Sequence, residues 1–111
     1  MDAGSLDQRV ILLKAQKNTL DSGEVVEVRV PFATRWAAVR PVRGTESWAT
    51  QQRFAEVEVK FELRYRKELD ATVAVRWNGV DHDVVEILRF PGGRPERMEI
   101  LAKGRADEGG A

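Results

Sequence analysis

The residues of this chain that could perform chemistry are few, and the first group is Asp81-His82-Asp83. Carboxylates beside an imidazole are able to bind a divalent cation or to exchange protons. In a β-strand, however, successive side chains point to opposite faces, so Asp81 and Asp83 point away from His82. Two carboxylates also fall short of the roughly six or more oxygen atoms that a hard cation takes. We therefore interpret His82 as a structural residue and expect no metal site.

A second group of carboxylates, Glu56, Glu58 and Glu62, alternates with Lys60 and Arg64. Acid–base catalysis of the glycosidase type needs two carboxylates that face each other across a cleft, one of them with a raised pKa. Carboxylates interleaved with basic residues on the exposed side of a strand are instead neutralised by their neighbours. We expect a solvated strand face here and no catalytic site.

Other catalytic arrangements are excluded by the residue types present. With no cysteine, the chain has no disulfide framework, thiolate zinc site or cysteine nucleophile, and its single histidine argues against a Ser–His triad. Gly92-Gly93 is not a phosphate-binding loop, because no Lys-Ser/Thr follows it and no strand–loop–helix context surrounds it. We expect neither enzymatic activity nor a cofactor.

The element best defined by the sequence is a strand from Glu56 to Arg66, in which apolar and charged residues alternate. A period of two places the apolar residues on one buried face and the charged residues on a wet face. The apolar residues are Val57, Val59, Phe61, Leu63 and Tyr65. Shorter apolar or alternating segments predict further strands at residues 9–16, 26–30, 34–42, 73–77, 80–88 and 98–102.

Turn residues separate these strands. Asp21-Ser22-Gly23 predicts a turn, and Asn78-Gly79 is the strongest short signal for a hairpin. Pro31 has no N–H group to donate to a sheet, so it either ends the second strand or places that strand at an edge. The sequence therefore predicts an all-β domain, a small antiparallel barrel or sandwich of six or seven strands.

One stretch, residues 43–55, lacks the alternation of the strands, and we interpret it as a long connecting loop that could include a short helix. Loops of this length in a small domain are commonly functional or disordered. Trp48 lies within it among Thr, Ser and Gln residues. Such an aromatic side chain either pins the loop to the barrel or anchors a partner, and both alternatives stay open.

The aromatic residues also raise the alternative of an oligonucleotide-binding barrel, in which they would stack against bases. For Phe61, Tyr65 and Trp77, which lie on apolar faces, core packing is the default, whereas Trp36 is left open. The formal net charge is zero, from 18 basic and 18 acidic residues, which argues against a dedicated nucleic-acid binder. The alternative predicts binding to single strands that weakens as salt rises.

The 111 residues fit one domain, which we place at residues 1–103, with a flexible C-terminal tail at 104–111. The N-terminus is acidic and polar, without the basic and apolar regions of a signal peptide. No apolar run approaches the roughly 20 residues of a membrane span. We expect a protein made in the cytoplasm, with no membrane partner.

The order and spacing of several short segments resemble the phage head–tail joining family, also called head closure, stopper or head–tail adaptor proteins, of long-tailed phages and gene transfer agents. The matching segments, spread over residues 4–103, are Gly4-Ser5-Leu6-Asp7-Gln8-Arg9-Val10, Asp21-Ser22-Gly23-Glu24, Arg35-Trp36-Ala37-Ala38-Val39-Arg40-Pro41, Gly44-Thr45-Glu46, Arg64-Tyr65-Arg66 and Asn78-Gly79. In one departure from the family pattern, His82 stands where the family usually has an aromatic residue, with Val84 at the aliphatic position that follows. This supports a half-buried, structural His82.

The resemblance implies a small β-barrel with a long loop that acts as a structural virion component at the head–tail junction. It implies a cyclic ring of six or twelve copies. The ring would lie below the portal or adaptor protein, close the capsid around packaged double-stranded DNA, and dock a tail terminator or tail tube protein. It implies no enzymatic activity and no cofactor, and synthesis in the cytoplasm of a bacterial host. A tail terminator or other tail-tube component is the alternative of the same class.

We expect the loop to supply the protein interface, and other residues to be structural. The interface residues expected are Arg43, Glu46, Trp48, Gln51, Gln52, Arg53 and Phe54. The structural residues expected are Trp36, Tyr65, Trp77, Asn78, Gly79 and His82. A loop that orders only on docking would keep the free subunit from associating early, so we expect a monomer in isolation.

Overall fold

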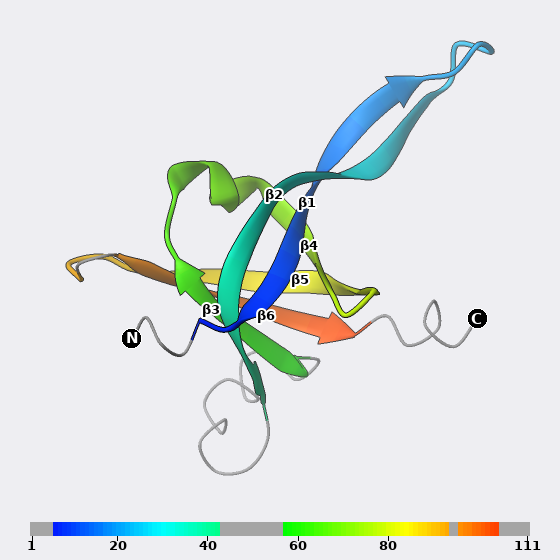
Figure 1. Ribbon diagram of the computed structural model, residues 1–111. Helices are drawn as coiled ribbons and strands as arrows, with labels where there is room; N and C mark the ends of the chain where they lie inside the picture. Colours follow the sequence, from blue (N-terminus) through cyan, green and yellow to red (C-terminus); the bar gives the residue numbers. More distant parts are fainter. Residues whose placement is uncertain (1–5, 43–56, 94–95, 105–111) are drawn as a thin grey trace.

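The fold is all β, as the sequence predicts, and a computed structural model describes it for residues 6–42, 57–93 and 96–104 (Figure 1). These residues form six antiparallel strands and one short 3₁₀ helix. They are β1 (Gln8–Thr19), β2 (Val25–Pro41), β3 (Val59–Arg64), η3 (Lys67–Ala71), β4 (Thr72–Trp77), β5 (Val80–Phe90) and β6 (Arg97–Gly104). Within this part of the chain, no helix has the length and apolar character of a membrane span.

The strands close into a barrel with the order β1-β2-β3-β6-β5-β4. The closing contact joins β1 to β4, where Ile11 pairs with Arg76 and Leu13 with Ala74. β6, the last described strand in the chain, lies between β3 and β5. The barrel interior is filled by apolar side chains from β1, β2, β3, η3, β4 and β6. Its buried residues are Val10, Leu12, Ala37, Val59, Phe61, Leu63, Leu69, Val75, Met98, Ile100 and Ala102.

The alternation predicted from Glu56 to Arg66 is found in β3 and its flanks. Phe61 and Leu63 are fully buried, whereas Arg64 is exposed on the opposite face. Backbone pairing extends beyond the strand at both ends, because the Glu58 N–H donates to the Ala102 carbonyl and the Tyr65 N–H donates to the Glu96 carbonyl. β3 spans Val59–Arg64 and is shorter than the predicted strand, Glu56–Arg66, because local patterns define the ends of an element less well than its existence.

The two strands predicted at residues 26–30 and 34–42 are one continuous strand, β2, so the prediction that Pro31 ends a strand is wrong. The alternative prediction, an edge position, is correct, because β2 pairs with β3 only from Ala38 onward. On the other side, Leu12 pairs with Ala33 and Leu13 with Pro31, so β2 carries one extra residue at this point. A bulge of this kind tolerates a residue without an N–H group.

Both predicted turns are present. Asn78 and Gly79 have φ angles of 54° and 78°, the left-handed pair that a two-residue hairpin between β4 and β5 requires. The turn between β1 and β2 is closed by two hydrogen bonds: the Gly23 N–H donates to the Leu20 carbonyl, and the Leu20 N–H donates to the Glu24 carbonyl.

The β1–β2 hairpin extends well beyond the barrel, as Figure 1 shows. β1 pairs with β4 only over Ile11–Lys14, so among the described strands residues 15–19 pair with β2 alone. We call residues 15–28 the arm. At its base, Arg29 on β2 forms an ion pair with Asp83 on β5, which ties the hairpin to the barrel.

Candidate functional site

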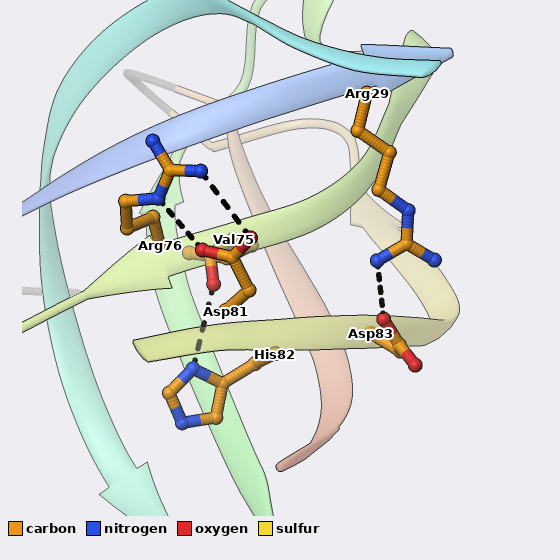
Figure 2. Close-up of polar contacts among 6 residues, drawn as sticks. All are labelled: Arg29, Val75, Arg76, Asp81, His82 and Asp83. Carbon is orange, nitrogen blue, oxygen red and sulfur yellow. Dashed lines mark hydrogen bonds and ion pairs between the residues drawn. The ribbon is translucent and has the colours of Figure 1, made fainter. Parts of the chain in front are cut away.

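The group Asp81-His82-Asp83 does not converge on one point (Figure 2). The Asp81 carboxylate accepts hydrogen bonds from Nε and Nη2 of Arg76, at 2.7 and 3.3 Å, and this contact raises the pKa of Arg76. The Asp83 carboxylate accepts a hydrogen bond from Arg29. Each carboxylate therefore faces a guanidinium group. In the described part of the chain, no group of three or more acidic, histidine or cysteine residues could hold a metal ion.

His82 points to the other face of β5 and is buried in the barrel. Its Nδ1 atom lies 3.4 Å from the Val75 carbonyl oxygen, which can only accept, so this contact places the proton on Nδ1. Its ring packs edge-on against Phe61, with 5.6 Å between centroids, and lies 6.1 Å from the ring of Trp77. The imidazole thus takes the place of a core aromatic side chain. The structural role of His82 stays a prediction with which this position is compatible, and the burial exceeds the half-burial expected.

Tyr65 and Trp77 lie at the margin of the same core. The Tyr65 hydroxyl donates to Asp70 Oδ2 at 2.9 Å, which joins the end of β3 to η3. Burial and this hydrogen bond raise the pKa of Tyr65, outweighing the opposite effect of the Arg89 guanidinium 4.3 Å from its ring. The Trp77 Nε1–H donates to the Gln8 side-chain oxygen at 3.2 Å. The structural roles of these residues stay predictions, and their contacts are compatible with them.

The carboxylates on the outer face of β3 are paired with bases. Glu62 Oε1 accepts from Arg40 Nε at 2.9 Å, and Glu62 Oε2 lies 3.5 Å from Lys60 Nζ. Burial alone would raise the pKa of Glu62, but the hydrogen bonds and charges of Arg40 and Lys60 outweigh it and hold this pKa below its ordinary value of 4.5. A general acid needs the opposite shift, so Glu62 is suited to an ion pair.

This pairing predicts an acid-dependent loss of stability. A carboxylate with a lowered pKa in the folded state stabilises the fold above its unfolded-state pKa, and this contribution is lost as the pH falls through the folded-state pKa. We expect Glu62→Gln to lower the free energy of unfolding by about 1 kcal/mol at pH 7 and to have little effect well below pH 4. Urea titrations at pH 7 and pH 3 measure the difference. Glu27→Gln, which removes an exposed carboxylate from the arm, is the control; an equal loss for Glu62→Gln at both pH values would contradict the prediction.

A hollow of about 790 Å³ lies beside the start of β1 and the end of β3, within the size range of ligand pockets. Its described lining consists of Leu6, Asp7, Arg35, Trp36, Arg64 and Arg66. Three guanidinium groups against one carboxylate make it cationic. The Trp36 side chain is 51% exposed, and the Arg9 guanidinium lies 4.9 Å from its ring.

Sequence reasoning missed this hollow, because its lining comes from three segments that only the pairing of β2 with β1 and β3 brings together. The signals were present individually. The sequence leaves Trp36 open between core and surface, and its alternation places Arg64 and Arg66 on the wet side of a strand. Trp36 was expected to be structural, and its half-exposed position at the hollow leaves that role a prediction.

The residues expected at the loop interface lie outside the described residues. The described ends of this segment meet, because the Val42 N–H donates to the Glu58 carbonyl at 3.0 Å and Pro41 pairs with Val59. The end of β2 and the start of β3 therefore lie side by side.

The family model described as phage head completion protein matches residues 1–105. The chain belongs to the phage head completion protein family. This family consists of structural virion proteins of the phage head and is not an enzymatic one. The resemblance found in the sequence is therefore confirmed, and with it a structural role at the phage head.

The fold of this head completion protein also occurs in a solved structure. The solution structure of protein SF1141 from Shigella flexneri 2a superimposes with a TM-score of 0.74, covering 96% of this chain and 99% of that one at 24% identity. At this identity the likeness shows the shared fold. A comparison with curated proteins finds no match.

Proposed function

We propose that this head completion protein forms a ring at the head–tail junction, which closes the capsid after DNA packaging and docks the tail. Membership of the family supports the location. The observation that carries the ring is the position of two unlike surfaces, the arm and the cationic hollow, at opposite ends of β1. A cyclic assembly needs such a heterologous interface, in which each subunit presents two different patches.

The proposed partners are those that the family resemblance implies. Six or twelve copies of the chain form the ring, with a portal or adaptor protein on the head side and a tail terminator or tail tube protein on the tail side. The packaged DNA is retained by obstruction of the channel. The even balance of 18 basic and 18 acidic residues suits a subunit that sits beside identical neighbours, because strong like charges would repel.

The test is to remove the protein from cells that produce the particles. We expect heads that package DNA but carry no tails and lose their DNA, together with separate, normal tails. Supplying the protein in trans restores tailed particles. Tailed, infectious particles without the protein would contradict the proposal. Tails of abnormal length, on heads that retain DNA, would favour the alternative of a tail terminator.

A further inference from the structure

The arm and the hollow of one chain cannot touch each other. Asp7, in the hollow, directly precedes β1, and the turn at the tip of the arm directly follows it. A strand rises about 3.3 Å per residue, so the twelve residues of β1 separate the two by about 40 Å. Figure 1 shows the arm leaving the barrel on the side away from the start of β1. Any contact between them joins two molecules.

The tip of the arm is acidic and flanked by apolar side chains. Asp21 and Glu24 lie in the turn, and neither has an ion-pair partner among the described residues. Next to them, Leu20 is 45% exposed and Val25 is 59% exposed. A two-stranded hairpin without further cover is only marginally stable in water. The tip therefore has both the charge and the apolar surface of a segment that packs against a partner.

The hollow has the complementary chemistry. Arg64 and Arg66 have no ion-pair partner in the described part of the chain, whereas Arg35 shares its charge with Glu68 at 3.3 Å. The half-exposed ring of Trp36 gives the same lining an apolar surface. Asp7 is the one acidic side chain of the described lining, at the edge next to β1. An acidic turn with apolar neighbours matches this lining in charge and in polarity.

We propose that the arm tip of each subunit inserts into the hollow of the next subunit around the ring. This inference rests on the proposed ring. Asp21 and Glu24 would pair with Arg64 and Arg66, and the apolar flanks of the tip would pack on Trp36. The hollow would also suit nucleic-acid phosphates, but the unpaired carboxylates that match it occur on the same chain, whose net charge is zero. A second copy of the chain is therefore the favoured occupant.

The absence of cysteine from the chain allows a direct test. The variant Ser22→Cys/Asp7→Cys carries one thiol at the tip and one at the hollow, too far apart to form a disulfide within a molecule. We expect mild oxidation of purified particles to give a ladder of covalent multimers on a non-reducing gel. The matched control, Ser22→Cys/Glu58→Cys, places the second thiol at the exposed position before the start of β3, at the opposite end of that strand from Arg64, and we expect it to remain a single band.

The outcomes separate this inference from the proposed function. If the particles carry the double variant and have tails, yet give no ladder, the arm-to-hollow contact is wrong and the ring proposal stands. If the wild-type protein is absent from purified particles, both the arm-to-hollow contact and the proposed ring are wrong. A third outcome would assign the hollow to nucleic acid: no ladder forms, and the isolated protein binds single-stranded DNA in a way that Arg66→Glu abolishes.

Charge exchange gives a second measurement that does not depend on disulfide geometry. We expect Glu24→Arg or Arg66→Glu alone to reduce the yield of tailed particles by about tenfold or more, because each leaves like charges facing each other. Combining the two substitutions should restore most of the yield. A double variant no better than the single ones would overturn the proposed pairing.

Discussion

Replacing Phe61 by alanine is expected to lower the free energy of unfolding by about 3–5 kcal/mol. Phe61 is fully buried in β3 and belongs to the main apolar core. Its ring makes edge contacts with Trp77, at 6.3 Å between centroids, and with His82, at 5.6 Å. Truncation leaves a cavity in the centre of a closed barrel, whose strands are hydrogen-bonded on both sides and cannot move in to fill it. Since the total free energy of unfolding of a small domain is about 5–15 kcal/mol, this loss is a large part of the stability.

Urea unfolding followed by circular dichroism measures this loss. Phe90→Ala is the matched control: Phe90 is 37% exposed, and the Arg97 guanidinium lies 4.5 Å from its ring. We expect that control to lose about 1 kcal/mol or less. If Phe61→Ala does not fold, Phe61→Leu retains most of the volume and should lose about 1–2 kcal/mol. A Phe61→Ala variant as stable as Phe90→Ala would show that the barrel core is not centred on this ring.

Deleting residues 45–53 is expected to leave the domain folded while abolishing tail attachment. The described ends of this segment are held together by the Val42–Glu58 backbone hydrogen bond and by β2–β3 pairing. The deletion therefore shortens the connection between two ends that are already adjacent. The entropic cost of closing a shorter connection is slightly lower. Under the proposed function, the same segment supplies the contact with the tail, with Trp48 as its anchor.

The measurement is the fraction of tailed particles in electron micrographs, combined with the melting temperature of the isolated variant. Trp48→Ala should reproduce most of the loss of tails, and its neighbour Ser47→Ala should have no effect. Particles of the deletion variant that still carry tails would remove this segment from the docking surface. A deletion variant that is unfolded would show instead that the segment belongs to the barrel core.

The local rules of strand formation were sufficient for much of this fold. Alternation predicted the buried face of β3, and Asn78-Gly79 predicted the β4–β5 hairpin, because both features depend only on neighbouring residues. Pro31 was misjudged as a possible strand end, because a bulge depends on the partner strand and not on the proline itself.

The candidate site was less accessible to sequence reasoning. The alternation at residues 26–30 predicts a strand, but Val26 and Val28 lie in the arm and are only half-buried. Alternation shows that a strand has an apolar face and does not show how far the strand extends beyond the barrel. The cationic hollow depends on the register of β2, which pairs with β1 on one side and with β3 on the other and so brings the start of β1 and the end of β3 to the same place. No local pattern encodes that proximity.

The place of β6 between β3 and β5 also sets the order in which the chain can fold. The β1–β2 and β4–β5 hairpins join strands that are neighbours in the sequence and can form early. β3 has no second partner until β6 pairs with it, more than thirty residues further along the chain. Barrels dominated by such non-local pairing fold in about milliseconds to seconds. We therefore expect the barrel to be completed only after β6, the last described strand, pairs with β3 and β5, whereas the arm needs nothing beyond β1 and β2.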